Sequence, residues 1–534
     1  MGVGKIMEKK LLLGDEAIAL GALHAGLSGV YAYPGTPSTE ITEFIQGNQL
    51  AKERGVHSRW STNEKTAMEA ALGMSFMGKR ALVCMKHVGL NVCADPFVNS
   101  GMTGVNGGVV VLVADDPSMH SSQNEQDSRF YAKFALIPCF EPSNQQEAYD
   151  MTRQAFDLSE QLRVPVLMRV TTRMAHSRAM VETTDAPRQQ NSHGLPQNTQ
   201  HFILLPAFAK RNYADLLAQQ PEFIRLSEEC GNNTYTRGTN PKRAIVTCGI
   251  AHNYMQEAGI AQGASVLKIT QYPLPVALVN RMVADGAEEI LVAEEGQPVV
   301  EELLRGLVPS HIKIRGRLTG DLPRMGELSP DCFAQSEIRN QKLEINTMVL
   351  PGRPPSMCQG CGHRDMYTAL NEVAREYNDA RIFGDIGCYT LGALSPFHAI
   401  HSCVEMGASI TMAKGAADAG QYPAFAVIGD STFTHSGMTG LLDCANCNAD
   451  VVVLISDNLT TGMTGGQDSA GTGKLERICM ALGVPEEHVR TVVPLAKNME
   501  EMKAVIREEV NYHGTSVVIA RRECIQTLKR KARK

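Results

Sequence analysis

Two polar segments near the end of the chain carry residue types that can bind a divalent cation together with a diphosphate. Gly429-Asp430-Ser431 follows the apolar run Ala424–Ile428, and Asp457-Asn458 follows the apolar run Val451–Ile455. Both runs predict buried parallel strands, and doubly wound sheets bind ligands at the carboxyl ends of their strands. The carboxylate and the amide at these ends are hard oxygen ligands of the kind that Mg²⁺ prefers. The two segments therefore predict a magnesium–diphosphate site.

The wider arrangement resembles the motif of thiamine diphosphate (ThDP) enzymes. The backbone carbonyl of Thr460 would complete the protein ligands, and the helix predicted over Ser436–Asn446 would direct its N-terminus at the phosphates. A bare Gly-Asp-Ser is common in turns, but its combination with two strands and an Asp-Asn pair is rare. ThDP enzymes also need a carboxylic acid from a different domain, which hydrogen-bonds the aminopyrimidine ring. Glu64, in the predicted helix Asn63–Met77, is the candidate; a helix cap or a solvated charge is the alternative.

The cysteines suggest a second site. Cys358 and Cys361 form a Cys-x-x-Cys turn, which can hold an iron–sulfur cluster or zinc, although the thiols could also be unligated. A second pair, Cys444 and Cys447, lies inside the motif helix and predicts buried packing. The same packing is predicted for the cysteines without partner spacing, which are Cys84, Cys93, Cys139, Cys230, Cys248 and Cys332.

Composition excludes several classes of protein. The chain has 534 residues, enough for three or four domains. Lys+Arg 51 against Asp+Glu 57 gives a net charge of −6, and aromatic residues make up 5%, which argues against a nucleic-acid partner. No apolar run is long enough to span a membrane, and the N-terminus does not read as a signal peptide. We therefore expect a cytoplasmic protein with no membrane partner, in which the 14 Cys are reduced rather than paired in disulfides.

The elements that must position these residues alternate between strand and helix patterns, so the predicted fold class is α/β with three doubly wound domains. Two would have the ThDP-binding fold, for the pyrimidine and the diphosphate, and one would resemble the transketolase C-terminal domain. The predicted domains are 1–185 (pyrimidine-type), 186–241 (linker and helical connection), 242–350 (transketolase C-terminal-like) and 351–534 (diphosphate and Mg²⁺). The strands on which they rest are Gly29–Tyr33, Arg80–Lys86, Gly108–Ala114, Val164–Arg169, Ala244–Cys248, Ser265–Ile269, Glu289–Ala293, Ala380–Phe383, Ala424–Ile428, Val451–Ile455 and Thr515–Ala520.

Over nearly its whole length the chain resembles the alpha subunits of the indolepyruvate ferredoxin oxidoreductase family, in the 2-oxoacid:ferredoxin oxidoreductase superfamily. The order of the three domains is also that of the family. The segments that carry the resemblance are Gly14-Asp15-Glu16-Ala17, Tyr33-Pro34-Gly35-Thr36-Pro37-Ser38, Asn63-Glu64-Lys65-Thr66, Ala114-Asp115-Asp116-Pro117, Gln123-Asn124-Glu125-Gln126-Asp127-Ser128-Arg129, Gly384-Asp385-Ile386-Gly387-Cys388-Tyr389 and Thr464-Gly465-Gly466-Gln467.

The resemblance implies ThDP- and Mg²⁺-dependent oxidative decarboxylation of an arylpyruvate with coenzyme A, giving an arylacetyl-CoA, CO₂ and reduced ferredoxin. It implies that Asp430, Asn458 and Thr460 hold Mg²⁺ and that Glu64, Thr36 and His120 are catalytic. Thr36, His120, Gln123 and Asn124 would contact the 2-oxoacid, with a turn hydroxyl and a surface loop as the alternatives. One 4Fe–4S cluster would be held by Cys358, Cys361, Cys388 and Cys524. The remaining residues implied to contact the cofactor are Gly35, Asp385, Cys388, Met406, Gly407, Gly429, Ser431, Gly462 and Met463.

Two departures from the family pattern affect the expected partners and substrate. Pyruvate-specific members place an arginine near Asp115-Asp116, so this chain is expected to take a larger substrate. The family's C-terminal ferredoxin-like segment does not follow Cys524 here. We therefore expect a ferredoxin or small ferredoxin-like subunit, a smaller gamma/beta-type partner subunit, and a dimer of heterodimers. The competing functions are a non-oxidative ThDP-dependent decarboxylase and a non-catalytic ThDP-binding regulatory subunit.

Overall fold

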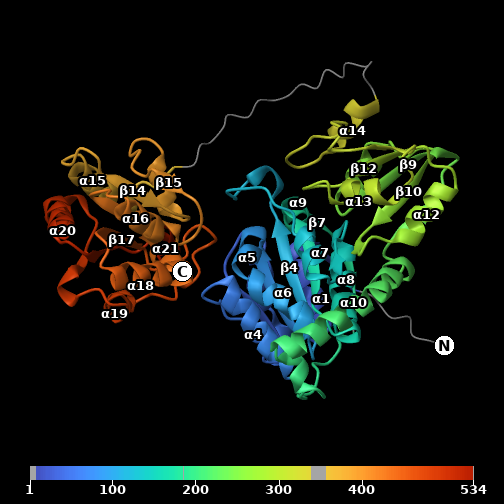
Figure 1. Ribbon diagram of the computed structural model, residues 1–534, viewed down its shortest axis with the longest axis horizontal. Helices are drawn as coiled ribbons and strands as arrows, with labels where there is room; N and C mark the ends of the chain where they lie inside the picture. The colour runs from blue at the N-terminus through green and yellow to red at the C-terminus, as the bar shows by residue number, and fades with distance from the viewer. Residues whose placement is uncertain (1–7, 185, 338–355, 533–534) are drawn as a thin grey trace. The chain divides into compact units, whose positions relative to one another are not determined.

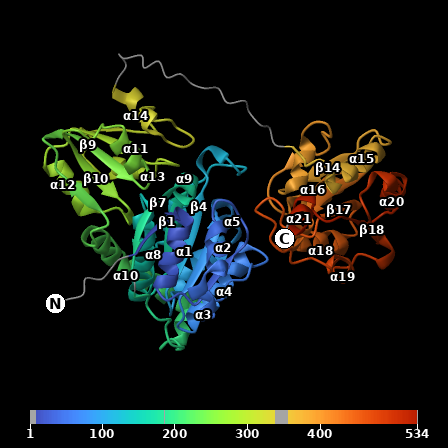
Figure 2. The same ribbon diagram turned by 180° about the vertical axis from the view of Figure 1, so that it is seen from behind.

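The computed structural model describes residues 8–184, 186–337 and 356–532. Backbone contacts divide the chain into two compact units, Met1–Glu344 and Ile345–Lys534. The domain boundaries predicted at residues 185 and 350 fall outside the described residues. The predicted fold class is confirmed, because the two units together hold three open, mainly parallel sheets with helices against their faces (Figures 1 and 2).

The first sheet of the first unit has six strands in the order β11-β5-β6-β4-β3-β2. All pair in parallel except β11, which is antiparallel to β5. The strands are β2 (Gly29–Ala32), β3 (Ala81–Lys86), β4 (Val109–Asp115), β5 (Cys139–Phe140), β6 (Val166–Thr171) and β11 (Gln271–Tyr272). A separate antiparallel pair joins β1 (Glu8–Leu13) to β7 (Arg178–Thr183). The central strands β3, β4 and β6 are buried on both faces, which explains why their sequences are continuous apolar runs.

Alternate residues of these strands enter two hydrophobic cores, as the two-residue period of a strand requires. Leu82 and Leu112 enter the core that contains α1 and α8, whereas Val83 and Val111 enter the core that contains α4 and α6. The helices of this region are α1 (Gly14–His24), α2 (Thr39–Gly47), α3 (Gln49–Glu53), α4 (Glu64–Phe76), α5 (His87–Val92), α6 (Ala94–Thr103), α7 (Arg129–Ala135), α8 (Gln145–Leu162) and α9 (Thr172–His176).

The second sheet of this unit has the order β13-β12-β9-β10-β8, with β8 antiparallel to β10 and the other pairs parallel. The long helix α10 (Pro206–Glu229) leads into it. Its strands are β8 (Thr234–Thr236), β9 (Asn240–Cys248), β10 (Ala264–Ile269), β12 (Glu289–Ala293) and β13 (Lys313–Arg315), and its helices are α11 (Ala251–Glu257), α12 (Val276–Ala284), α13 (Val299–Leu307) and α14 (Pro330–Glu337). Directly after β10 the chain returns to the first sheet as β11.

Buried ion pairs join the two sheets of the first unit. Arg129, at the start of α7, is 2.9 Å from a carboxylate oxygen of Glu294, which follows β12. Arg169 on β6 pairs with Asp115 at 2.6 Å and donates a 2.8 Å hydrogen bond to the backbone carbonyl of Glu295. These side chains are almost fully buried, so each charge depends on its partners for stabilisation.

The second unit is built on one fully parallel sheet of order β15-β14-β16-β17-β19-β18. Its strands are β14 (Arg381–Gly384), β15 (Ser402–Cys403), β16 (Ala424–Gly429), β17 (Val451–Asp457), β18 (Val489–Val492) and β19 (Thr515–Arg521). Helices α15 (Gly362–Ala374) and α20 (Met499–Asn511) share one core with it, and α16 (Ala408–Asp418), α18 (Met438–Cys447) and α19 (Leu475–Ala481) share the other (Figure 1). The C-terminal helix is α21 (Ile525–Lys531).

Every strand predicted from the sequence is present in the described residues. The motif helix begins earlier than predicted, at Asp430 rather than Ser436. It runs through α17 (Asp430–Thr432) and a five-residue π-helical turn, Phe433–Gly437, before α18. The N-terminus of the helix therefore lies within the Gly-Asp-Ser motif itself. Over the described residues, no helix is both long and apolar enough to cross a bilayer.

Candidate functional site

Asp430 stands at the carboxyl end of β16, where the strand passes directly into α17. Its side chain is buried, and no hydrogen-bond donor among the described residues reaches its Oδ2 atom. Burial, followed by the charge of the neighbouring Asp457, raises the pKa of Asp430 to about 7. A buried and unpartnered carboxylate oxygen is costly unless a cation neutralises it. This arrangement fits a divalent cation.

The loop after β17 folds back on itself next to this carboxylate. Gly429 pairs with Ser456 in the sheet, so the residues that follow them leave it side by side. Asn458 accepts a hydrogen bond from the Thr460 amide at 3.1 Å, and the Thr460 hydroxyl donates to the Gln467 carbonyl at 2.8 Å.

The Ser431 hydroxyl lies 2.9 Å from that of Thr461, which joins the two motif segments. The structure thus brings together both segments of the predicted Mg²⁺ site. Asp457 itself is engaged elsewhere, because its carboxylate accepts hydrogen bonds from Arg521 at 2.6 Å and from the Leu459 amide at 3.2 Å.

The neighbouring strand β14 ends at a second buried carboxylate, Asp385. It accepts hydrogen bonds from the Ser409 hydroxyl at 2.6 Å and from the Tyr389 hydroxyl. Burial raises its pKa to about 7. A Cβ atom on Gly429 would lie 2.6 Å from the Tyr389 ring, so glycine is required where this side chain crosses the end of β16. Asp385 therefore anchors the loop after β14 beneath the motif.

Three further predicted cofactor contacts lie in loops of this unit. Gly407 has φ +93°, and a Cβ there would lie 2.7 Å from Ser436 Cβ, so only glycine allows this loop to approach the motif helix. Met406 beside it is half-buried. On the other side of the motif, Met463 is exposed in the loop after β17.

The four predicted cluster ligands line one cavity of about 110 Å³. They come from four places: Cys358 and Cys361 precede α15, Cys388 follows β14, and Cys524 follows β19. Cys388 and Cys524 meet because β14 and β19 are parallel strands of one sheet and end at the same edge. The cavity wall also includes residues of the motif loop, because a Cβ on Gly462 would lie 3.2 Å from Cys388 Sγ and 3.5 Å from Asn458 Nδ2. The Cys524 amide in turn donates to the Asn458 carbonyl at 3.1 Å.

Of the four cysteines in this cavity, Cys358 is exposed, and Cys361, Cys388 and Cys524 are half-buried. Burial first, and then the other three thiols, raise the pKa of Cys388 to about 12. Gln526 donates a 3.3 Å hydrogen bond to Cys358 Sγ. His363, which the sequence did not single out, also lines the cavity. Its two ring nitrogens have no partner among the described residues, and burial lowers its pKa to about 4.

The remaining cysteines divide by burial. Packing is confirmed for Cys84, Cys93, Cys139, Cys248 and Cys444, which are buried, and Cys332 is half-buried. The prediction of buried packing is wrong for Cys230 and Cys447, which are exposed. Both lie at the C-terminal ends of helices, Cys230 as the cap of α10 and Cys447 as the last residue of α18. The shared Cys-x-x-Cys spacing therefore did not give Cys444 and Cys447 the same environment.

Glu64, in the first unit, is the first residue of α4 and is only 5% exposed. The helix is capped by Asn63, whose side chain accepts a hydrogen bond from the Thr66 amide at 2.8 Å, so Glu64 is not the cap. Helix α5 packs closely against it, because a Cβ atom on Gly89 would lie 2.5 Å from Glu64 Oε1. The glutamate is thus held in one buried position by its neighbours.

Thr36 lies half-buried in the loop after β2, which its neighbours close into a turn. The Gly35 amide donates to the Thr39 hydroxyl at 3.0 Å, and the Ser38 hydroxyl donates to the Gly35 carbonyl at 2.9 Å. Lys86, at the end of the adjacent β3, was missed by the sequence analysis. Burial lowers the pKa of this lysine to about 8.

The loop after β4 holds the other predicted substrate residues, His120, Gln123 and Asn124, and all three are exposed. His120 Nε2 is 3.2 Å from a carboxylate oxygen of Glu327, and Asn124 lies 3.2 Å from the His87 ring. Asp116 holds the base of this loop, because its carboxylate accepts hydrogen bonds from the Ser121 amide and the Thr172 hydroxyl, both at 2.9 Å. Asp115 is paired with Arg169. Asp115 and Asp116 therefore have structural partners in this loop.

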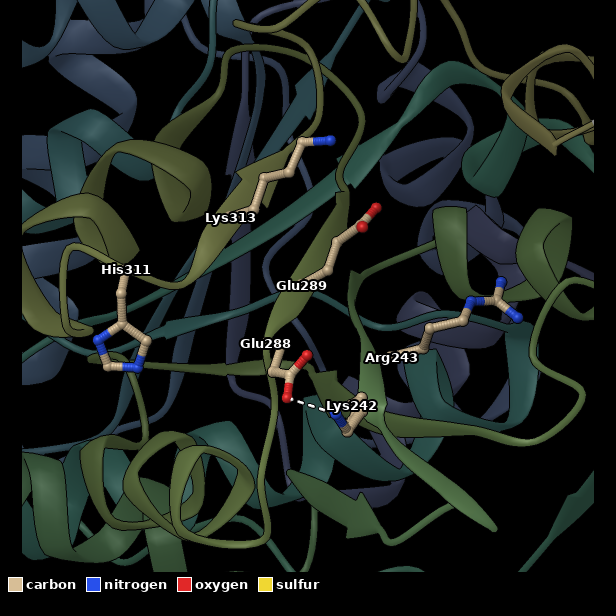
Figure 3. A pocket seen from close by; sticks show the side chains of 6 residues that line it. All are labelled: Lys242, Arg243, Glu288, Glu289, His311 and Lys313. Carbon is tan, nitrogen blue, oxygen red and sulfur yellow. Dashed lines mark ion pairs between the residues drawn. The ribbon is translucent and has the colours of Figure 1, made fainter.

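A separate open hollow of about 670 Å³ lies at the amino ends of β9, β12 and β13 (Figure 3). Among its lining residues, Lys242 and Glu288 form an ion pair at 2.7 Å. The side chains of Arg243, His311 and Lys313 point away from one another in Figure 3, so they do not converge on a ligand.

Comparison with known proteins agrees with the fold and the motif. Residues 20–214 match the family described as "Pyruvate flavodoxin/ferredoxin oxidoreductase, thiamine diP-bdg", and residues 385–520 match "Thiamine pyrophosphate enzyme, C-terminal TPP binding domain". The α/β sheets, the Gly-Asp-Ser and Asp-Asn segments and these matches define a subunit of a ThDP-dependent 2-oxoacid oxidoreductase.

Relatives that match over most of their length identify the family more specifically. The indolepyruvate oxidoreductase subunits IorA of Archaeoglobus fulgidus and Thermococcus kodakarensis are each 37% identical, over 97% of this chain and 86% of their own length. That of Methanothermobacter thermautotrophicus is 36% identical, over 97% of this chain and 87% of its own length. The chain belongs to the family of indolepyruvate oxidoreductase subunits IorA, and the resemblance proposed from the sequence is confirmed.

A solved structure of 2-oxoglutarate:ferredoxin oxidoreductase from Magnetococcus marinus superposes with a TM-score of 0.48 at 15% identity, over 58% of this chain and 62% of that one. At this level of similarity the superposition says nothing about individual site residues.

Proposed function

We propose that the chain is the catalytic alpha subunit of an enzyme that decarboxylates an arylpyruvate oxidatively. One 2-oxoacid and one coenzyme A would give an arylacetyl-CoA and CO₂, and two electrons would pass singly to two ferredoxins. The relatives' name, indolepyruvate oxidoreductase, supports the substrate class, and coenzyme A is proposed from the resemblance to this family. The electron path is supported by the second unit itself.

The observation that carries the proposal is the wall shared by the cysteine cavity and the motif loop. Asn458 and Gly462 belong to the loop beside Asp430, and both line the cavity with Cys358, Cys361, Cys388 and Cys524. A non-oxidative decarboxylase needs no redox group beside its diphosphate site. This proximity favours the oxidative reaction over the non-oxidative alternative.

The chain's own residues would divide the work between cofactor binding and proton control. Asp430, the Asn458 amide oxygen and the Thr460 carbonyl would hold Mg²⁺ on the diphosphate, and the unpartnered Asp430 oxygen fits this role. Glu64, which is buried and fixed by Gly89, would hydrogen-bond the aminopyrimidine ring. When bound, ThDP supplies the carbanion that attacks the 2-oxo carbon and the ring that accepts electrons as CO₂ leaves.

The cysteine geometry supports a 4Fe–4S cluster over zinc. Tetrahedral zinc holds thiolates at about 2.3 Å from the metal and so about 3.8 Å from one another. Among the described residues, no three of these four sulfurs lie within 4.8 Å of one another. A four-iron cube lies between its four thiolates and spaces them more widely than one ion does. The cavity fits the cluster, whose role would be to accept electrons one at a time.

Substrate recognition would fall to the edge of the first sheet. Thr36 would contact the 2-oxoacid. The exposed loop that carries His120, Gln123 and Asn124 would recognise the side chain of this substrate. Lys86 adds a cation at this edge, where it donates a 3.2 Å hydrogen bond to the Ser121 hydroxyl of the same loop. A cation here suits the carboxylate that every 2-oxoacid carries.

The family is named for a subunit, so the chain works with at least one partner. We propose a smaller gamma/beta-type partner subunit in a dimer of heterodimers, with ferredoxin or a small ferredoxin-like subunit as the electron acceptor. We propose that the chain works in the cytoplasm, where its thiols would be reduced.

Anaerobic turnover with a panel of 2-oxoacids, with and without coenzyme A and the partner subunit, tests this function. Ferredoxin reduction that requires coenzyme A and is fastest with indolepyruvate or phenylpyruvate is the expected result. Decarboxylation that proceeds equally well without coenzyme A or an electron acceptor would overturn the oxidative assignment.

A further inference from the structure

Three side chains of the first unit form a cluster that none of the roles above uses. Asp15 lies in the first turn of α1, Glu40 in the first turn of α2, and His176 is the last residue of α9. Each offers one ligand atom, and these atoms all lie within 4.8 Å of one another. In the described part of the chain, no other group of three histidine, cysteine or acidic side chains comes this close.

Asp15 is the unusual member of this cluster. It is 0% exposed, and neither of its carboxylate oxygens has a hydrogen-bond partner among the described residues. Burial, followed by the charges of Glu40 and Glu16, raises its pKa well above the ordinary value. A carboxylate that is both buried and unpartnered is costly, and its nearest charged neighbours are also acidic. The charges that raise the pKa of Asp15 are therefore both negative, and a cation beside it would relieve this repulsion.

The other two side chains complete a ligand set. Glu40 Oε1 lies 3.6 Å from His176 Nε2, and Glu40 Oε2 is buried without a hydrogen-bond partner. His176 and Glu40 are about one-third exposed, at 35% and 37% of their side chains. The cluster thus has three buried acidic oxygens on one side and an imidazole open to solvent on the other, which leaves a path for an ion and its water ligands.

The backbone fixes this geometry before any ligand binds. A Cβ atom on Gly14 would lie 2.0 Å from the Met174 carbonyl oxygen, so only glycine lets α1 begin this close to α9. The Gly14 amide donates to the Ser177 carbonyl at 3.2 Å, which ties the two helices together. Glu16 is committed elsewhere, because its carboxylate accepts from the Leu13 amide at 2.8 Å. Asp15 is therefore held toward Glu40 and His176 by the fold.

We propose that Asp15, Glu40 and His176 bind a divalent transition-metal cation. Two carboxylates and one imidazole suit Mn²⁺, Fe²⁺ or Zn²⁺ rather than a metal that prefers thiolates. Oxygen and nitrogen ligands lie about 2.0–2.2 Å from such an ion, so ligand atoms stand roughly 3.0–3.5 Å apart. The present spacing, at most 4.8 Å, would need to shrink by at most about 1.3–1.8 Å, which side-chain rotation of Glu40 and His176 can supply. The ion would neutralise both carboxylates and join α1, α2 and α9.

Manganese titration tests this site without recourse to catalysis. The parent is the full chain carrying Asp430→Asn, which removes the carboxylate of the proposed Mg²⁺ site, dialysed against chelator and kept free of ThDP. Added MnCl₂ is followed by the electron paramagnetic resonance signal of free Mn²⁺. Asp15→Asn is added as an isosteric neutral variant, His176→Gln as a variant on the exposed side, and His311→Gln as a control on an exposed histidine of the second sheet.

We expect the parent and the His311→Gln control to bind one Mn²⁺ per chain and to melt at a higher temperature with it. Asp15→Asn should bind none at concentrations that saturate the parent, and His176→Gln should bind at least about tenfold more weakly. If Asp15→Asn does not fold, His176→Gln alone carries the comparison. A parent that binds no Mn²⁺, or Asp15→Asn and His176→Gln variants that both bind it as the parent does, would overturn the proposal.

Discussion

Replacing Asp430 with asparagine should make the metal-free protein more stable while removing its response to Mg²⁺ and ThDP. Asparagine keeps the shape of the side chain but carries no charge. In metal-free protein the buried Asp430 carboxylate is a destabilising group, because Oδ2 has no partner. In cofactor-bound protein the same oxygen would be the only charged one among the proposed metal ligands. The two effects have opposite signs, so one variant tests both.

The magnitude follows from the pKa of Asp430. Burial and the charge of Asp457 raise it from 3.8 to about 7, roughly three units, each of which is worth about 1.36 kcal/mol. Because the folded state holds the proton more tightly, metal-free stability is fully present below pH 4 and is lost as pH rises through 7. At pH 8 the variant should therefore be more stable by at most about 4 kcal/mol, and at pH 5 by less than half of that.

Thermal unfolding of metal-free protein at both pH values, with and without Mg²⁺ and ThDP, measures these effects. For a unit of this size 4 kcal/mol corresponds to roughly 10 °C. Asp468→Asn, at an exposed position in the loop after β17, is the matched control and should change neither quantity. Equal melting temperatures of the variant and the wild type at pH 8, together with unchanged ThDP affinity by calorimetry, would refute the reasoning.

Four further outcomes are expected. Glu64→Gln should retain ThDP but slow hydrogen exchange at C2 of the cofactor by about 10²–10⁴, followed by NMR, and wild-type exchange would remove Glu64 from this role. Gly89→Ala should impair turnover at unchanged ThDP affinity, because its Cβ would displace Glu64 Oε1, 2.5 Å away; full turnover would mean that Glu64 needs no such restraint. Anaerobic protein should be brown with about four irons per chain, and Cys524→Ser, unlike the exposed control Cys230→Ser, should lose the colour but still bind ThDP; colourless wild-type protein would exclude the cluster. The chain without its partner should lack full coenzyme A-dependent activity, and complete turnover by the chain alone would contradict a partner subunit.

The sequence was sufficient where local pattern and strand polarity decide the outcome. The continuous apolar runs Gly108–Ala114 and Val451–Ile455 predicted buried parallel strands, and the structure has β4 and β17 at these places. Because parallel strands end at one edge, residues that follow different strands could be predicted to meet there. Cys388 and Cys524 come together in this way.

The features that the sequence did not predict depend on tertiary contacts. Lys86 and His363 look ordinary in the sequence, and only burial by distant segments changes their pKa values. The two-residue strand β11 has no periodicity to detect, and its pairing with β5 joins segments more than a hundred residues apart. Asp15 lies in a segment that carries the family resemblance. That its carboxylate is buried without a hydrogen-bond partner becomes clear only from the packing of α2 and α9 around it.

The pairing of β11 with β5 also determines the order in which the chain can fold during synthesis. The first sheet lacks its edge strand until residue 272 has left the ribosome, although its other strands end at Thr171. Until then the open edge of β5 can pair with a neighbouring nascent chain. Arg129 and Arg169 also lack the partners that Glu294 and Glu295 provide. The first sheet can therefore be completed only after β8, β9 and β10 of the second sheet have been synthesised.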